Sequence, residues 1–171
     1  MSEDSDKYSP LKVLELLNRH GVEYLLVGGQ AEVLMGSPRL TYDTDVAYAR
    51  SPENLERLAA ALREVNARLR VKGEPVDLPF QLDATALAFG SNFTFSTDVE
   101  DLDLLGYVEP IGTFEDLMSN HELYDLAGLQ VKTIGLDDLI RVKEHISRPK
   151  DKASLAHLRA IKEVREQRDG A

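Results

Sequence analysis

Cysteine is entirely absent from the 171-residue chain, which excludes disulfide bonds, thiolate metal ligands and a cysteine nucleophile. No apolar run approaches the roughly 18 residues that a membrane-spanning helix needs. The acidic, polar stretch at residues 1–9 has no apolar segment of the kind found in a secretory signal. We therefore expect a cytoplasmic protein with no membrane contact.

Positive charge is also scarce: 20 Lys and Arg stand against 30 Asp and Glu, and the formal net charge is −10. Proteins that bind nucleic acid non-specifically are typically basic, so the balance argues against that class. Carboxylates that surround a divalent cation would raise the negative count for a different reason. The 4 histidines are scattered and form no His-x₃-His pair, so a zinc site is not expected.

The hydrophobic pattern predicts an α+β chain in which a mixed sheet is flanked by helices. Tyr24–Val27 is typical of a short strand, and the apolar residues of 11–17 recur at helical spacing. Further strands are predicted at 41–49, 69–71, 93–97 and 102–107, a hairpin at 124–133, and helices at 30–35, 51–67, 84–88, 113–118, 137–147 and 150–165. We predict one domain over 1–171, with a core at about 9–110 and a helical and hairpin part at about 113–165.

Two aspartates alternate along the strand predicted at 41–49. Asp43 and Asp45 should share one face, about 7 Å apart, because side chains alternate along a strand. Two close carboxylates repel each other unless a cation or a proton lies between them, and Mg²⁺ prefers such oxygen ligands. The solvated face of an edge strand would show the same pattern. An EF-hand is excluded, because Tyr48 stands where the loop needs glycine.

Gly28-Gly29 follows one predicted strand and precedes a helix. Glycine lets backbone amides approach a phosphate, and a helix N-terminus favours anions. A tight turn explains the same pair without any ligand. The pair is not a P-loop, because Gly-Lys-Ser/Thr is missing, and it lacks the third glycine of a dinucleotide fingerprint.

A second carboxylate pair lies in Asp101-Leu102-Asp103-Leu104. Strand alternation places Asp101 and Asp103 on one face and the leucines on the other. If this strand lay beside the strand of Asp43 and Asp45, Asp103 would complete a three-carboxylate cluster. A solvated strand start is the alternative interpretation.

Taken together, the order strand, Gly28-Gly29, helix, Asp43-x-Asp45 and then Asp103 resembles the nucleotidyltransferase superfamily that includes DNA polymerase β. Gly28-Gly29-Gln30-Ala31, followed by Arg39-x-Thr41-x-Asp43-x-Asp45, more narrowly resembles the AbiEii-type branch, which includes the nucleotidyltransferase toxins of bacterial toxin–antitoxin systems. Lys143 and Arg148-Pro149-Lys150-Asp151 are similar to the lysine and the later Lys/Arg-Asp on the closing helices of that branch. The similarity covers roughly residues 11–158.

The resemblance implies a nucleotidyltransferase fold and a role for each matched position. Asp43 and Asp45 would hold Mg²⁺, or Mn²⁺, and Asp103 would be the third carboxylate, with Asp101 as its fallback. The implied nucleotide contacts are Gly28, Gly29, Arg39, Thr41, Lys143 and Asp151. Lys143 would meet the triphosphate as a point charge and join the three aspartates in catalysis. Asp151 has a second explanation, because an acid in the first turn of a helix is favoured by the helix dipole.

The implied reaction transfers a nucleotidyl group from an NTP to a hydroxyl acceptor. The resemblance suggests RNA, such as the 3′ end of tRNA, or a protein as the acceptor, and a cognate antitoxin as a partner. The alternative is a non-catalytic nucleotide-binding or partner-docking module of the same fold.

Overall fold

The computed structural model describes residues 10–38, 41, 43–71, 74–75, 82–146 and 148–170. The helices are α2 (Pro10–Arg19), α3 (Gly28–Leu34), α4 (Pro52–Glu64), α5 (Ala84–Phe89), α6 (Phe114–Met118), α7 (Leu136–Ile146) and α8 (Pro149–Asp169). The strands are β1 (Tyr24–Val27), β2 (Thr44–Tyr48), β3 (Arg68–Val71), β4 (Glu74–Pro75), β5 (Asn92–Ser96), β6 (Asp101–Leu105), β7 (Glu122–Leu126) and β8 (Leu129–Thr133).

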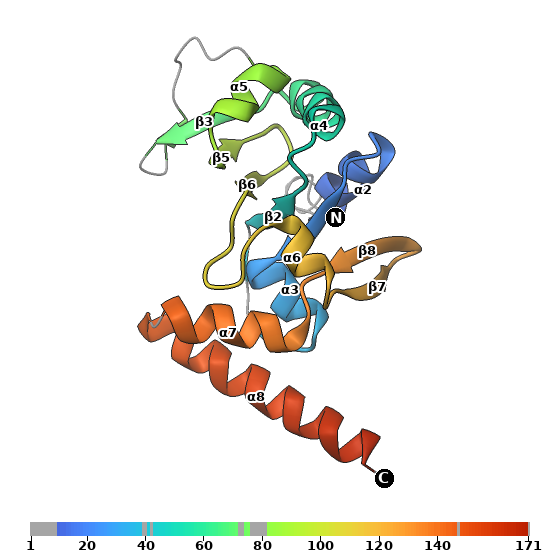
Figure 1. Cartoon of the computed structure of the whole chain (residues 1–171), viewed down its shortest axis with the longest axis vertical. Coiled ribbons are helices and arrows are strands. Elements are labelled where there is room, and N and C mark those ends of the chain that lie inside the picture. The colour runs from blue at the N-terminus through green and yellow to red at the C-terminus, as the bar shows by residue number, and fades with distance from the viewer. Residues whose placement is uncertain are drawn as a thin grey trace, which may run out of the picture.

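The strands form a mixed sheet in the order β4-β3-β5-β6-β2-β1-β8-β7. The pairs β2–β6 and β1–β8 are parallel, whereas β1–β2, β5–β6, β3–β5 and β7–β8 are antiparallel. Helices α4 and α5 lie at one end of the molecule and α7 and α8 at the other, where α8 runs away from the sheet (Figure 1). The predicted mixed sheet flanked by helices, with a helical C-terminal part, is thus confirmed.

Strand β1, near the centre of the sheet, is buried on both faces. All four residues of β1 are buried, because β2 and β8 flank the strand and helices pack on it. Leu14 and Leu17 of α2 are likewise buried, as their helical spacing predicts. Each fully buried leucine contributes roughly 1.5–3 kcal/mol to folding, so this core fixes the ends of β1 and β2 from which the site is built.

Two predicted boundaries were wrong where the chain enters the site. The strand predicted at 41–49 begins at Thr44, because its pairing with β1 extends only to Asp45 and its pairing with β6 only to Thr44. Asp43 therefore lies just before the strand. The helix predicted from Gln30 begins at Gly28, so both glycines belong to its first turn. Among the described residues, no helix combines the length and apolar composition that crossing a bilayer requires.

Candidate functional site

A cleft of about 270 Å³ opens between the central strands and the junction of α7 and α8. Its apolar walls come from β1, β6, α7 and neighbouring loops. Its polar and glycine lining consists of Gly28, Gly29, Thr41, Asp43, Asp45, Asp103, Lys143, Arg148 and Lys150. The structure therefore brings most of the predicted site residues into one cavity. Arg39 lies outside the described residues.

Three carboxylates meet on one wall of this cleft. Asp45 of β2 is paired directly with Asp103 of β6 in the parallel ladder, and Asp43 precedes Asp45 by two residues. Burial raises the pKa of Asp45 to about 7, helped by a hydrogen bond with Asp103 and by the charges of Asp103 and Asp43. Burial and the charge of Asp103 also raise the pKa of Asp43. A proton on Asp45 would relieve this repulsion, and a cation could relieve it instead.

Gly28 is needed for the position of the Asp45 side chain. A Cβ atom at Gly28 would lie 2.1 Å from Asp45 Oδ2, and the residue has a φ of +70°, which favours glycine. At Gly29, a Cβ atom would lie 2.9 Å from Thr41 Oγ1. The two glycines therefore make room for two polar side chains of the cleft, a more specific requirement than a tight turn.

Arg70 of β3 reaches the acidic wall and was missed by the sequence analysis. Its Nη1 donates a hydrogen bond to Asp101 Oδ2 at 2.6 Å, and its Nη2 lies 3.5 Å from Asp103 Oδ1. Asp101 is thus held by an arginine outside the cleft lining, whereas Asp103 also faces Asp45. The alternation of Arg68-Leu69-Arg70 indicates that two arginines share a face, but not which strand they oppose.

A further buried acid, Glu100, lies beside β2. Thr44 Oγ1 donates a hydrogen bond to Glu100 Oε2 at 3.0 Å, and burial raises the pKa of Glu100 to about 7. Because Thr44 and Asp45 are adjacent in a strand, their side chains point to opposite faces. Glu100 therefore belongs to the far side of the sheet and not to the cleft.

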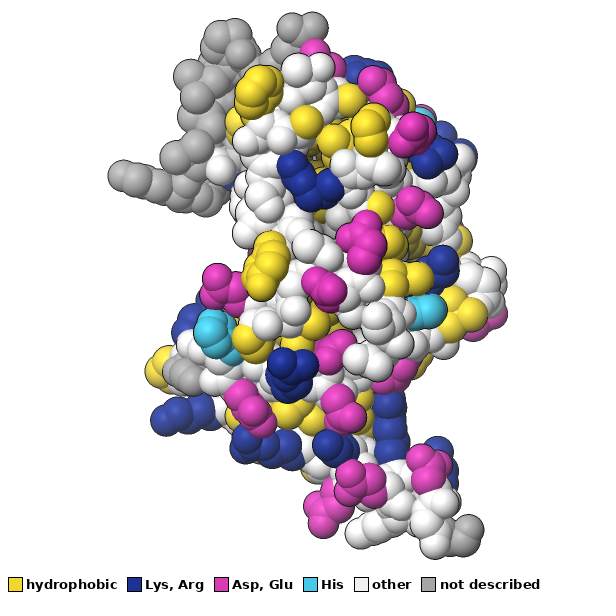
Figure 2. Space-filling model, viewed as in Figure 1, with side chains coloured by type: hydrophobic (Ala, Val, Ile, Leu, Met, Phe, Trp, Pro, Cys, Tyr) yellow, Lys and Arg dark blue, Asp and Glu magenta, His cyan; other side chains and the backbone are white. Residues whose placement is uncertain are grey.

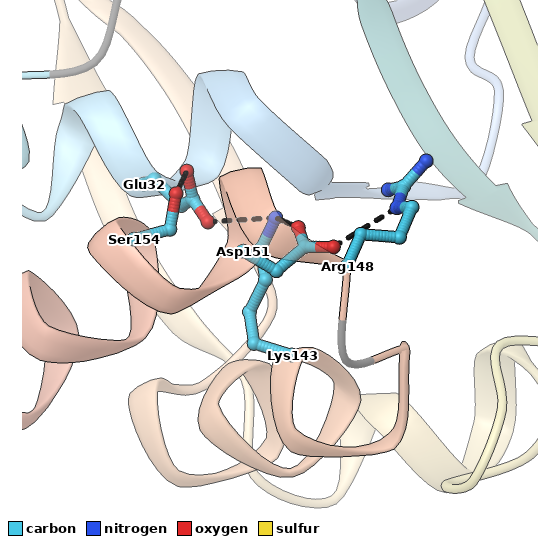
Figure 3. Close-up of polar contacts among 5 residues, drawn as sticks. All are labelled: Glu32, Lys143, Arg148, Asp151 and Ser154. Atoms are coloured by element: carbon cyan, nitrogen blue, oxygen red, sulfur yellow. Dashed lines mark hydrogen bonds and ion pairs between the residues drawn. The ribbon is translucent and has the colours of Figure 1, made fainter.

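Lys143 of α7 lies on the opposite wall, between two carboxylates (Figure 3). Its ammonium donates a hydrogen bond to Asp151 Oδ1 at 3.1 Å and lies 3.0 Å from Glu32 Oε1. Arg148 Nε donates a hydrogen bond to Asp151 Oδ2 at 2.9 Å. Burial would raise the pKa of Asp151, but the hydrogen bonds from Arg148 and Lys143 lower it overall.

Asp151 itself is buried in the first turn of α8 and does not line the cleft. Its contacts with residues that line the cleft are those with Lys143 of α7 and with Arg148. Glu32 was missed by the sequence analysis. The available signal was that Glu32 is the one charged residue in the sequence of α3, GGQAEVL.

The two walls of the cleft carry opposite charge. The carboxylates rise from the sheet, and Lys143, Arg148 and Lys150 come from α7 and the start of α8. Lys and Arg side chains gather at the end of the molecule formed by α7 and α8, interspersed with Asp and Glu (Figure 2). This arrangement can hold a cation on one side and a polyanion on the other.

The acidic wall fits a hard divalent cation, although no three His, Asp or Glu side chains of the described ranges are already arranged as a metal site. The available donors are carboxylate oxygens, which Mg²⁺ and Mn²⁺ prefer. Asp103 Oδ1 is buried, and no described group donates a hydrogen bond to it. Asp43, Asp45 and Asp103 could therefore hold such an ion, which would take the place of a proton on Asp45.

Comparisons with known proteins identify the fold. No protein-family model and no curated protein match the sequence. Among solved structures, the lincosamide antibiotic adenylyltransferase LnuA in its lincomycin-bound form is similar with a TM-score of 0.61 and 15% identity, over 94% of this chain and 98% of LnuA. An antigenic nucleotidyltransferase-like protein from Paracoccidioides brasiliensis is similar with a TM-score of 0.62 and 14% identity, over 94% of this chain and 77% of that protein.

A third similar structure is that of ANT(2″)-Ia in complex with adenylyl-2″-tobramycin. The TM-score is 0.55 and the identity 15%, over 86% of this chain and 84% of that one. These structural neighbours are nucleotidyltransferases. The chain thus has the nucleotidyltransferase fold, and this fold places a three-carboxylate cleft opposite a basic wall.

Proposed function

We propose that the chain is a Mg²⁺-dependent nucleotidyltransferase that transfers a nucleotidyl group from an NTP to a hydroxyl acceptor. The observation that carries this proposal is the direct pairing of Asp45 with Asp103 on adjacent parallel strands. Asp43 and Gly28 lie in the same cleft, and Lys143 faces them. Similarity to LnuA and ANT(2″)-Ia across most of the chain supports the same chemistry.

In this reaction, the acceptor oxygen attacks the α-phosphorus of the NTP. The bond from the α-phosphorus to the β-bridging oxygen breaks, and pyrophosphate leaves in line. Asp103, the third carboxylate, accepts the proton of the acceptor hydroxyl. A bound Mg²⁺ would supply charge stabilisation for the attacking and leaving oxygens, and Asp43, Asp45 and Asp103 would be its ligands.

The phosphates would lie toward the basic wall. Lys143 offers a buried ammonium, and Arg148 and Lys150 add charge from the start of α8. Gly28 and Gly29 occupy the first turn of α3, which would leave room for a phosphate near the backbone. Arg39 and Thr41 are the remaining proposed nucleotide contacts, and Asp151 would act through Lys143.

Two kinds of acceptor are compatible with this site. The AbiEii-type sequence resemblance supports an RNA end such as that of tRNA, or a protein hydroxyl, and with it a toxin that has a cognate antitoxin. LnuA bound to lincomycin and ANT(2″)-Ia bound to adenylyl-2″-tobramycin support a small hydroxylated molecule as the second candidate. The net charge of −10 disfavours an acceptor that needs many phosphate contacts.

A transfer assay tests the proposal. The protein is incubated with Mg²⁺ and each α-labelled NTP, in separate reactions with tRNA, with extracted protein and with a panel of hydroxylated small molecules. We expect label on one acceptor class, lost by more than about 10³-fold in Asp45→Asn and Asp103→Asn. If the wild type labels nothing beyond Asp45→Asn with any NTP, transferase activity is refuted. Mg²⁺-dependent NTP binding without turnover would instead support a nucleotide-binding or partner-docking module.

A further inference from the structure

A cluster of four charged residues, of which Glu32, Lys143 and Asp151 are buried and Arg148 is exposed, joins three helices beside the cleft (Figure 3). Lys143 of α7 contacts Glu32 of α3 and Asp151 of α8, and Arg148 contacts the second oxygen of Asp151. The side chain of Glu32 is completely buried. With two acids and two bases, the cluster is formally neutral.

Packing alone gives a poor account of Glu32. A buried ion pair is seldom more stabilising than well-packed apolar residues of similar volume, because both charges lose their hydration. Glu32 lies on a short helix whose other residues, apart from Gln30, are apolar or glycine. Lys143 and Arg148 both line the cleft, but Lys143 alone of the two contacts both acids of the cluster in the described contacts, so the cluster controls where its ammonium lies.

Helix α3 connects both walls of the cleft. It begins at Gly28, against which the Asp45 carboxylate packs, and Glu32 follows four residues later, about one helical turn. The same short helix therefore contacts the acidic wall at one end and Lys143 at the other. An ammonium that is held by Glu32 and Asp151 keeps a defined spacing from the carboxylates.

We propose that Glu32 is a positioning residue, which fixes the Lys143 ammonium at the cleft so that it meets the phosphates of a bound NTP. The contact between Lys143 and the NTP rests on the proposed function, whereas the immobilisation of Lys143 by Glu32 is independent of it. The ammonium donates a hydrogen bond to Asp151 and forms an ion pair with Glu32, and because it has three donors it retains capacity for a ligand in the cleft.

The first measurement is independent of activity. In ¹H–¹⁵N spectra of the lysine ammonium groups, a buried and paired Lys143 should give a slowly exchanging signal that disappears in Lys143→Met. We expect this signal to be lost or exchange-broadened in Glu32→Gln, which keeps the shape of the side chain but removes its charge. Glu144→Gln on α7 is the matched control, because Glu144 pairs with the exposed Arg159 and should leave the signal unchanged.

The second measurement is steady-state turnover. Glu32→Gln should lower kcat about 10- to 100-fold, because small displacements of a charged group are costly in the transition state. The KM for the NTP should change by less than about threefold, because the more positive local charge offsets the looser position of Lys143 in binding the phosphates. In a Lys143→Met background, adding Glu32→Gln should change kcat by less than about twofold, because the two residues act as one unit.

Several outcomes would overturn the inference. A Glu32→Gln variant with an unchanged Lys143 signal or an unchanged kcat would do so, as would an equal loss of kcat in the presence and absence of Lys143. If Glu32→Gln does not fold, Glu32→Asp is measured instead, and it must show a shifted or broadened Lys143 signal. A wild type that holds Lys143 rigidly and shows no turnover would refute the proposed function while supporting the positioning role.

Discussion

The two walls of the cleft are held in place by different forces. On the acidic wall, the backbone ladder places Asp45 opposite Asp103 whatever their charges, and the result is repulsion. On the basic wall, Lys143 is held by the opposite charges of Glu32 and Asp151. The first wall therefore gains from a bound cation, whereas Lys143 on the second is already paired and positioned. Removing one charge from the acidic wall should therefore stabilise the metal-free protein, whereas removing the charge of Lys143 from the basic wall should destabilise it.

The largest expected effect comes from Lys143→Met. This variant leaves Glu32 and Asp151 buried without their shared counter-ion, which should lower the free energy of unfolding by about 3–5 kcal/mol. Urea titration at pH 7 measures it, with Lys162→Met as the exposed control, since Lys162 pairs with the exposed carboxylate of Asp137. A loss below about 1 kcal/mol would mean that the basic wall is not held by these ion pairs.

On the acidic wall, adding negative charge should lower the stability, and a rise in pH adds that charge. The pKa of Asp45 is raised to about 7, so the folded state binds more protons than the unfolded state between pH 4 and 7. The free energy of unfolding of the metal-free protein should therefore decrease as pH rises through this window, by about 2–4 kcal/mol from Asp45. Urea titrations from pH 4 to 8 should show this decrease, and Asp45→Asn should reduce it. The same pH slope in both proteins would contradict the predicted repulsion.

Gly28→Ala should disturb the acidic wall through sterics alone. The added Cβ would overlap with Asp45 Oδ2, and the φ of +70° adds strain, together about 1–3 kcal/mol of stability. Gly36→Ala is the matched control, because Gly36 has a φ of +107° but, chain neighbours aside, no atom of the described residues lies within 4 Å of its Cβ position. Thermal unfolding of both variants separates the backbone term from the contact with Asp45. Equal losses would mean that Gly28 makes no special room for the carboxylate.

The smallest effect is expected at Asp101. Its carboxylate is held by Arg70 and does not line the cleft, so Asp101→Asn should reduce the transfer rate by less than about tenfold. The matching change at Asp103 should abolish transfer. Rates measured under identical conditions decide which of the two is the third carboxylate, and a greater loss at Asp101 would exchange their roles.

Local patterns predicted the parts of this site that depend on one segment. Strand alternation correctly grouped Asp101 with Asp103, and the Gly28-Gly29 pair was correctly placed after a strand. The pairing of β2 with β6 could only be inferred from the resemblance, because no local signal specifies which distant strand becomes a neighbour. Glu32 and Arg70 were missed for the same reason: each meets its partners across elements that are far apart in the sequence.

The most direct test of the metal-binding acidic wall is calorimetry of NTP binding with and without Mg²⁺, carried out at pH 7 in two buffers of different ionisation enthalpy. We predict binding that requires Mg²⁺ and releases about half a proton, because Asp45, with its pKa raised to about 7, is about half protonated at this pH and the cation displaces that proton. Asp45→Asn should lose both the Mg²⁺ requirement and the proton release. NTP binding that is equally tight without Mg²⁺, with no proton released, would contradict the three-carboxylate metal site.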